Sequence, residues 1–455
     1  MSRKEVCGLY RASMATVNTT WMINKIKNKL KNAPILKRIA SGAFWSIFGT
    51  ASAKLIVLSA GIVCANILGK QGYGELGIVR STINLFVVLG TVGLGITATK
   101  FISQYKNVDN RKVENIVNIT TLFTFCSAVI ITLLLFIFAD YIATNTLSAP
   151  NLKNAIRFSS LLLFTTIMNG VFNGILAGYE KFKNIAINTF ISSAIEGVLI
   201  IIGAYYWGVN GAIVGFGIGI SSLMLFNSMK ARSIFKKNGI SLNILKIKKK
   251  DLSILYKFSI PAALSSFLVA PAYWVVRTIL VRHNGFGELG IFEAADQWRI
   301  IILFIPSALS NIILPILSSL TNTDKNDYKK ALYINLGLNV SIAFVLATSV
   351  SLAGKYIMGA YGDGFNETLP LVIIAFSTVF SSFASVVGVS IVSRGKMWTS
   401  LMFNFLWSIM FISMTYIFVS NGKGALGISL ALLLSYVLHS LFQSIYLFNL
   451  LRKIN

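Results

Sequence analysis

The sequence predicts an all-α integral membrane protein with about twelve transmembrane helices in two parallel six-helix repeats. Of the 455 residues, 55% are hydrophobic and only 12% are charged, whereas about 25% of residues are charged in a soluble chain. Apolar runs recur along the chain, each near the ~20 residues that cross a bilayer as a helix. The runs are continuous, and barrel strands would instead alternate apolar with polar residues, so a barrel is excluded.

A glycine-rich heptapeptide that occurs twice indicates an internal repeat. Gly72-Tyr-Gly-Glu-Leu-Gly-Ile78 returns as Gly285-Phe-Gly-Glu-Leu-Gly-Ile291, with six of seven residues identical and a shift of 213 residues (285 − 72). Each copy is a short polar break between long apolar runs. Glycine permits positive φ and a tight reversal, and a glutamate at the start of the outgoing helix suits the helix dipole. The expected turn residues are Gly72, Gly74, Glu75, Gly285, Gly287 and Glu288.

The hydropathy pattern gives twelve spans with only short breaks between them. They are expected at residues 41–66, 76–102, 115–139, 153–177, 184–206, 210–235, 254–282, 288–318, 330–354, 366–391, 398–420 and 424–450. Six spans in each half make both halves enter the membrane in the same direction. The repeat is therefore parallel, about an axis along the membrane normal.

The same segmentation divides the chain into five parts. They are a basic amphipathic cytoplasmic segment (1–40), the first lobe (41–236), a cytoplasmic linker (237–253), the second lobe (254–450) and a cytoplasmic tail (451–455). The first forty residues contain no small-residue cleavage site after a short apolar core, so we expect no cleaved signal peptide.

The net charge of +26 is a topology signal, and we expect no nucleic-acid partner. With both termini in the cytoplasm, 30 of the 41 lysines and arginines fall on inner segments and five fall in outer loops. This bias follows the positive-inside rule, and the inner charges attract anionic lipid headgroups. Three cysteines without metal-ligand spacing and two histidines predict neither a metal site nor a disulfide framework.

Nine ionisable residues fall inside the expected spans. They are Lys54, Arg80, Arg157, Lys257, Arg277, Arg299, Glu196, Glu293 and Asp296. Each costs at least ~2.5–3.5 kcal/mol at the bilayer centre, so it normally faces a partner or a water-filled cavity. Arg157 and Lys257 begin their spans, where long side chains can reach the interface. The other seven are candidates for function.

The eighth span carries the densest cluster, Glu293-Ala-Ala-Asp-Gln-Trp-Arg299. Steps of three place Glu293, Asp296 and Arg299 on one side of the helix, and Arg277 on the preceding span can reach the depth of the two acids. The alternative is an internal salt-bridge cluster that joins the two spans. The repeat also makes Arg80 equivalent to Glu293, which suggests that these two charges latch the outer mouth.

Prolines are concentrated in the seventh and eighth spans, at Pro261, Pro271, Pro306 and Pro315. Because proline removes a backbone hydrogen bond and bends a helix, the second lobe is expected to hold a bending pair. Kinks that do not move are the alternative.

The run 65–77 (Ala-Asn-Ile-Leu-Gly-Lys-Gln-Gly-Tyr-Gly-Glu-Leu-Gly), with Gly93-Leu-Gly95 and Lys100-Phe-Ile-Ser-Gln104, resembles the start of the polysaccharide transporter family. These are the Wzx-type O-antigen and capsule flippases of the multidrug/oligosaccharidyl-lipid/polysaccharide superfamily. The second glycine-rich turn is also similar to that family. The resemblance extends over about residues 41–450, and beyond the first run it is mainly a resemblance of architecture.

The resemblance implies two lobes around a central cavity that carries an undecaprenyl-diphosphate-linked oligosaccharide from the inner to the outer leaflet of the bacterial cytoplasmic membrane. Transport would serve surface polysaccharide biosynthesis and proceed by alternating access, driven by H+ or Na+ and without another cofactor. Implied partners are membrane lipids, a polysaccharide polymerase and a chain-length regulator. No catalytic residue and no enzyme activity are expected.

Depth and charge, rather than a short motif, assign roles within such a cavity. The basic residues suit the diphosphate, and they are Lys54, Arg80, Arg277 and Arg299. The amide of Gln297 and the indole of Trp298 suit sugars. The acids suit ion coupling, and they are Glu196, Glu293 and Asp296.

Two other functions remain open. A multidrug or cation exporter of the same superfamily would favour an acid in the first lobe, where Lys54 stands at mid-depth and Glu196 keeps the option open. A membrane O-antigen polymerase or glycosyltransferase would act on the same substrates. Such enzymes usually carry a large outer loop or an acidic pair, and the outer loops here are short, with scattered Asp140, Asp363 and Glu367.

Overall fold

The computed structural model describes residues 34–242, 259, 268–320 and 325–452, and every regular element among them is a helix. Eight helical stretches of this part are long and apolar enough to cross a membrane. The prediction of an all-α multi-pass membrane protein is therefore confirmed. Most of the predicted segment 1–40, most of the linker 237–253, Lys257, Pro261 and the end of the tail 451–455 lie outside the described residues.

Two helices of the first half, α2 (Pro34–Thr91) and α6 (Phe182–Asn238), are long because each runs through a pair of predicted spans. The other elements described in this half are α3 (Leu94–Tyr105), α4 (Asn110–Tyr141), the single turns η1 (Ile142–Thr146) and η2 (Pro150–Leu152), and α5 (Lys153–Gly178). The backbone breaks inside α2 at Gly69 (φ 66°) and inside α6 at Gly208 (φ 58°). Both breaks fall between spans that the sequence separates.

Helices of the second half are shorter. They are α8 (Val269–Asn284), α9 (Phe286–Ile302), α10 (Phe304–Leu320), α11 (Lys325–Leu352), α12 (Gly354–Gly359), α13 (Leu369–Ser393), α14 (Met397–Ser420) and α15 (Gly424–Arg452). The twelve-span count and the lobe boundaries stay predictions, because α2 and α6 each merge two spans and residues 243–258 and 260–267 are not described.

Two expected single spans are each broken about twenty residues after the start of the glycine-rich heptapeptide. The span 76–102 is interrupted where Val92 and Gly93 take φ values of 41° and 66°. The span 288–318 is interrupted at Leu303, just before Pro306 in the first turn of α10. Proline lacks an N–H and cannot continue the hydrogen-bond ladder of the preceding turn. Residues 92–93 correspond to residues 305–306 under the repeat shift, so the two halves share this break.

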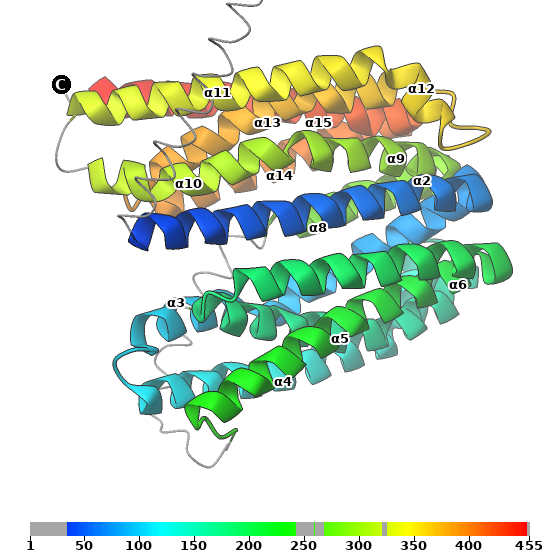
Figure 1. The fold of residues 1–455 in the computed structure, drawn as a ribbon. Helices are drawn as coiled ribbons and strands as arrows, with labels where there is room; N and C mark the ends of the chain where they lie inside the picture. Colours follow the sequence, from blue (N-terminus) through cyan, green and yellow to red (C-terminus); the bar gives the residue numbers. More distant parts are fainter. Residues whose placement is uncertain (1–33, 243–258, 260–267, 321–324, 453–455) are drawn as a thin grey trace, which may run out of the picture.

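Helices pack mainly within their own half of the chain. Helix α5 contacts α3, α4 and α6, and α13 contacts α11 and α15, whereas α2 contacts both α6 of its own half and α9 of the other. Figure 1 shows α3 to α6 in the lower part, α10 to α15 in the upper part and the first part of α2 running between them. The junction of the halves is therefore built by α2, α8 and α9.

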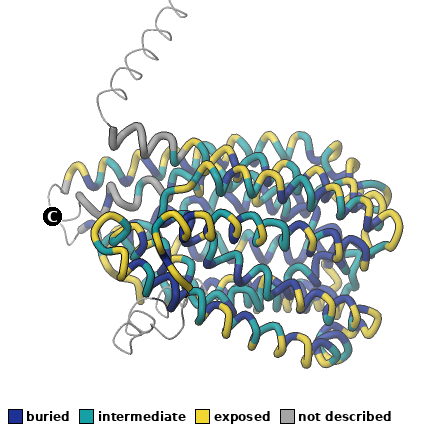
Figure 2. The backbone as a smooth tube through the Cα atoms, turned by 60° about the horizontal axis from the view of Figure 1, so that its bottom comes forward, coloured by how far each residue is buried: buried dark blue, intermediate teal, exposed yellow. Residues whose placement is uncertain are grey.

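Outward surfaces of the bundle are apolar, as lipid contact requires. Figure 2 shows exposed residues along the outward sides of the peripheral helices and buried residues inside. The break in α6 carries three exposed aromatics, Tyr205, Tyr206 and Trp207. Aromatic side chains with a polar group gather where membrane meets water, which places this break at a membrane boundary.

The repeat turns join the two halves at one end of the molecule, which we call the repeat end and define by Lys70–Glu75 of α2 and Gly285–Gly290 of α9. A methyl group added at Gly74 would lie 1.9 Å from the carbonyl oxygen of Phe286, and one at Gly290 would lie 2.1 Å from that of Lys70. The backbones of α2 and α9 therefore touch. Figure 1 shows the bend of α2 near α9 and α12 at the right, with the C-terminus at the left.

The turn prediction is partly wrong in its residues. Gly285 does take positive φ (86°), and Glu288 lies in the first turn of α9, where it accepts a hydrogen bond from the N–H of Ala425 at 2.7 Å. In the first half, however, the positive-φ residue is Gly69, three residues before the copy begins, and Gly72 and Gly74 are helical. These two glycines allow neighbouring segments to approach closely, and they do not reverse the chain. Glu75 is an acceptor for the Asn151 amide at 3.4 Å.

Candidate substrate cavity

Two adjoining cavities lie where the halves of the chain meet. The first, of about 480 Å³, is lined by Arg80, Arg277, Glu293, Asp296 and Arg299 among others, and we call it the arginine cavity. The second, of about 490 Å³, is lined by Ser46, Thr50, Lys54, Arg299 and Ser307 among others, and we call it the lysine cavity. Arg299 and Ile300 line both. The two cavities thus meet at α9.

A cluster of four charges forms one wall of the arginine cavity. Arg277 of α8 donates from Nε to Glu293 at 2.5 Å and from Nη2 to Asp296 at 3.1 Å. Arg299 donates from Nε to the other oxygen of Asp296. The structure brings together the three residues that the spacing of α9 grouped, and Arg277 of α8 joins them as expected. The two ion pairs of Arg277 also join α8 to α9, as the salt-bridge alternative predicted, and the functional role of the cluster stays a prediction.

Aromatic rings hold the two guanidinium groups in place. The Arg277 guanidinium lies 5.2 Å from the ring centre of Tyr273 and 5.3 Å from that of Phe292. The Arg299 guanidinium lies 5.0 Å from the ring centre of Tyr273. Arginine over an aromatic face is attracted by the ring quadrupole, most strongly when the pair is desolvated. Tyr273 therefore contacts both arginines.

Arg80 faces the same cavity from α2. Its guanidinium lies 4.8 Å from the ring centre of Phe216, and its Nε has no hydrogen-bond partner among the described residues. The predicted latch between Arg80 and Glu293 is not formed, because Arg277 from the neighbouring helix pairs with Glu293 instead. Glu293 does pack against α2, since a methyl group added at Gly77 would lie 2.6 Å from its Cγ.

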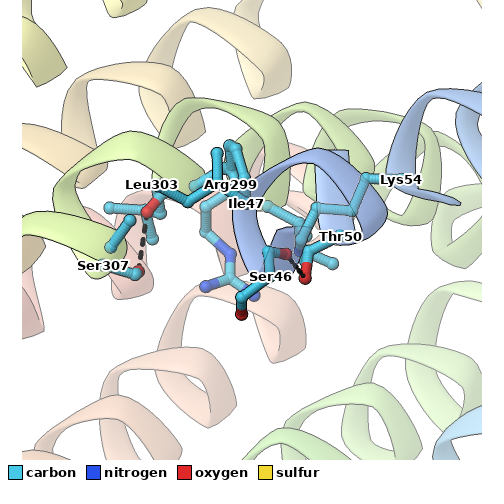
Figure 3. Close-up of a pocket in the computed structure, with 10 residues that line it drawn as sticks. Ser46, Ile47, Thr50, Lys54, Arg299, Leu303 and Ser307 are labelled. Carbon is cyan, nitrogen blue, oxygen red and sulfur yellow. Dashed lines mark hydrogen bonds between the residues drawn. The ribbon is translucent and has the colours of Figure 1, made fainter. Parts of the chain in front are cut away.

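The lysine cavity places polar groups on one side of the first part of α2. Ser46, Thr50 and Lys54 follow one another at intervals of four residues, and Thr50 donates to the Ser46 carbonyl at 2.8 Å. Figure 3 shows Arg299 between this helix and the turn that carries Leu303 and Ser307. Lys54 and Arg299 thus contribute one positive charge each from opposite sides.

The remaining predicted residues lie outside the two cavities. Gln297 donates to the Tyr73 hydroxyl and accepts from the Tyr361 hydroxyl at 3.1 Å, so its amide joins α2, α9 and the segment after α12. Trp298 packs against the hydrophobic core. Glu196 of α6 packs on Gly219, where an added methyl would lie 2.3 Å from its Cβ. The sugar-binding and ion-coupling roles of these residues stay predictions.

The cavity also contains residues that the sequence analysis did not select. Ser81 and Asn84 line the arginine cavity from α2, Tyr273 from α8 and Tyr436 from α15. Ser81 and Asn84 follow Arg80 by one and four residues, a spacing that keeps them near one side of a helix. The spacing of Ser46, Thr50 and Lys54 carries the same signal. Nothing in the sequence marks the two tyrosines, because their place depends on how the halves pack.

Comparisons with known proteins give a consistent set of relatives. A family model described as "Polysaccharide biosynthesis protein" matches residues 39–321. The EPS I polysaccharide export inner membrane protein EpsE of Ralstonia nicotianae is 28% identical over 207 residues, which are 44% of this chain and 46% of that protein. The chain therefore spans about half the length of that relative. The lipid III flippase of Escherichia coli is 24% identical over 295 residues, 62% of this chain and 68% of that protein.

Solved structures of similar fold are transporters of the MOP superfamily. An inward-facing multidrug resistance MATE family transporter has a TM-score of 0.75 at 17% identity, covering 88% of this chain and 96% of that one. An outward-facing MATE family transporter has a TM-score of 0.67 at 16% identity, covering 92% and 96%. At these identities the likeness shows the fold alone.

Proposed function

Since the chain belongs to the polysaccharide biosynthesis protein family, whose model matches residues 39–321, we propose that it is a flippase for lipid-linked oligosaccharides. It moves undecaprenyl-diphosphate-linked repeat units from the inner to the outer leaflet of the bacterial cytoplasmic membrane, for surface polysaccharide biosynthesis. Both termini face the cytoplasm in this proposal, and the repeat end faces outward. The polymerase and the chain-length regulator are its proposed partners.

The observation that carries the proposal is the set of guanidinium groups in the arginine cavity. Arg80, Arg277 and Arg299 reach this cavity from α2, α8 and α9. A guanidinium presents a planar fork of donors that matches phosphate oxygens, and such charge-assisted bonds are stronger than neutral ones. In a bilayer, buried positive charge needs an anionic partner. Arg277 and Arg299 already pair with carboxylates, whereas the Arg80 Nε has no hydrogen-bond partner among the described residues, so a diphosphate headgroup is the partner that we propose for Arg80.

The exposed apolar side chains beside the lysine cavity support a path for the lipid tail in the membrane. It lies between the first part of α2 and the α9–α10 turn, and the apolar side chains Phe48, Ile300 and Ile305 are exposed on these helices. A prenyl chain is as apolar as the bilayer, so it gains nothing from entering a charged cavity. We propose that the tail remains in the membrane while the headgroup passes between α2 and α9.

Alternating access requires the repeat end to open when the opposite end closes. The tight contact of α2 with α9 at Gly74 and Gly290 supports a state that is closed at the repeat end. The driving ion is H+ or Na+ in this proposal, with Glu196 of the first half as its acceptor.

Flipping by the purified protein in vesicles tests the proposal. The measurement is the transfer of a fluorescent prenyl-diphosphate-linked sugar between leaflets, read by quenching from outside. We expect transfer by the wild type, strong loss for Arg299→Ala and Arg277→Ala, and wild-type transfer for Arg111→Ala, whose side chain is exposed. Wild-type vesicles that leave the lipid in place would refute the flippase.

The same preparation distinguishes the two other functions. Accumulation of cationic dyes without lipid transfer would identify a multidrug or cation exporter, which the basic lining of both cavities disfavours. Elongation of the sugar chain on the lipid would identify a polymerase or glycosyltransferase.

A further inference from the structure

The two arginines best placed for a diphosphate are already engaged by carboxylates. Asp296 is 4% exposed and lies between both guanidinium groups, and Arg277, at 8% exposed, also holds Glu293. Two positive and two negative side chains make the cluster neutral. Arg80 and Lys54 form no ion pair within the part of the chain that the structure describes. The α8–α9 wall of the cavity is therefore charge-compensated.

We propose, resting on the proposed function, that Glu293 and Asp296 occupy the positions of the two phosphates and that the diphosphate binds by displacing them from Arg277 and Arg299. Carboxylate and phosphate present oxygen pairs to the same planar fork of an arginine. One site can therefore hold either anion but not both. The two acids are internal competitors of the substrate.

Matching two carboxylates to two phosphates makes the exchange selective for a diphosphate. Asp296 bridges the arginines, and Glu293 engages only Arg277. A single phosphate group replaces one of these contacts and leaves the other carboxylate in its place, beside a new negative charge. Like charges at short range in a buried site repel strongly. A diphosphate replaces both carboxylates at once.

Displaced carboxylates need a new counter-charge. A buried ionised carboxylate without a partner is costly, and such a group takes up a proton instead. The other charged and titratable groups of the cavity are Arg80 of α2, Tyr273 of α8 and Tyr436 of α15. Among the residues that line the two adjoining cavities, Arg80 and Lys54 are the cations left outside the cluster, and both also face the incoming diphosphate. Binding of the anionic substrate is thus linked to proton uptake at Asp296 and Glu293, and its release to proton loss.

Calorimetry on the full chain in nanodiscs tests the exchange. Farnesyl diphosphate is the probe and farnesyl monophosphate its single-phosphate counterpart. Binding heats in two buffers of different ionisation enthalpy give the number of protons taken up. The variants are Asp296→Asn and Glu293→Gln, which keep side-chain shape. Asp140→Asn is the matched control, because Asp140 pairs with Lys153 at 2.7 Å away from the cavity.

For the wild type we expect diphosphate binding with net proton uptake, and weaker binding of the monophosphate. Asp296→Asn removes a competitor, so it should bind the diphosphate about tenfold more tightly or better. It should also take up about one proton fewer and discriminate less against the monophosphate. Glu293→Gln should change the same quantities in the same direction, and it serves if Asp296→Asn does not fold. Asp140→Asn should match the wild type.

Two results overturn the exchange in distinguishable ways. Diphosphate binding whose affinity and proton uptake are the same in wild type, Asp296→Asn and Glu293→Gln would reject the internal competitors and leave the flippase standing. Absence of diphosphate binding to the wild type, together with absence of lipid transfer in vesicles, would reject both the exchange and the proposed function.

Discussion

Substitution of Gly74 by alanine should open the repeat end. The added methyl carbon would lie 1.9 Å from the carbonyl oxygen of Phe286, whereas ordinary contact begins near 3.4 Å. The backbones of α2 and α9 must therefore separate by about 1.5 Å, because the obstacle is a backbone atom that cannot rotate away. Overpacking of this kind costs about 1–3 kcal/mol, which shifts an equilibrium between closed and open states about 5- to 150-fold.

The assay is the distance between spin labels on the two halves at the repeat end. Asn210 and Asn421 are exposed and suit labelling after Cys7, Cys64 and Cys126 are replaced by alanine. Asn210 follows Val209, which lies against Gly72, and Asn421 lies four residues before Ala425, which is bonded to Glu288. We expect Gly74→Ala to move the distance distribution to longer values.

A matched control uses the equivalent glycine of the second copy. A methyl group added at Gly287 would lie 3.3 Å from the flexible end of the Lys70 side chain, which can move. Gly287→Ala should therefore keep the wild-type distribution. If Gly74→Ala also keeps it while remaining folded, the backbone contact is not what closes this end, and the reasoning fails.

Three further predictions concern single contacts. Glu288→Gln should lower the thermal unfolding midpoint, because the carboxylate that accepts from the Ala425 N–H at 2.7 Å loses its charge at a helix start, an effect of about 0.5–1 kcal/mol; Glu75→Gln should change the midpoint less, and an equal change would contradict this account. Tyr73→Phe leaves the Gln297 amide without its acceptor and should cost about 1–3 kcal/mol of unfolding free energy in chemical denaturation; an unchanged value would show that water replaces the hydroxyl. Glu367 lies in the segment before α13. Its pKa is raised from the ordinary 4.5, mainly because the carboxyl is partly buried and also because the Glu288 carboxylate is near. The folded state therefore holds this proton to higher pH than the unfolded state, and stability falls as pH rises from the ordinary value through the folded one; Glu367→Gln should flatten that decline in a series of unfolding measurements, and an unaltered slope would reject it.

Sequence periodicity was sufficient to predict the charged cluster and the helix content. Steps of three along α9 place Glu293, Asp296 and Arg299 together, and the hairpin through Gly285 brings Arg277 to them. Both relations are local, so helix geometry alone determines them. The choice between Arg277 and Arg80 as partner of Glu293 is not local, since it depends on how α2 packs across α9.

The glycine-rich copies illustrate a second limit of sequence reasoning. Identical residues predicted identical turns, but Gly285 reverses the chain whereas the first break lies at Gly69, before its copy begins. Glycine both permits positive φ and permits close approach, and the sequence does not say which property is used. At Gly72 and Gly74 the approach of neighbouring side chains and of α9 decides it. The bonds of Gln297 to Tyr73 and Tyr361 also depend on how distant segments pack, so the sequence does not reveal them.

Helices α3 and α10 begin directly after the shared breaks at Val92–Gly93 and Leu303. At ~1.5 Å per residue, their 12 and 17 residues extend about 18 and 25 Å from each break. A swing of about 10° would carry the tips by about 3 and 4 Å, by the same geometry. Such a swing would widen the end of the bundle away from the glycine contacts by several ångströms without moving those contacts.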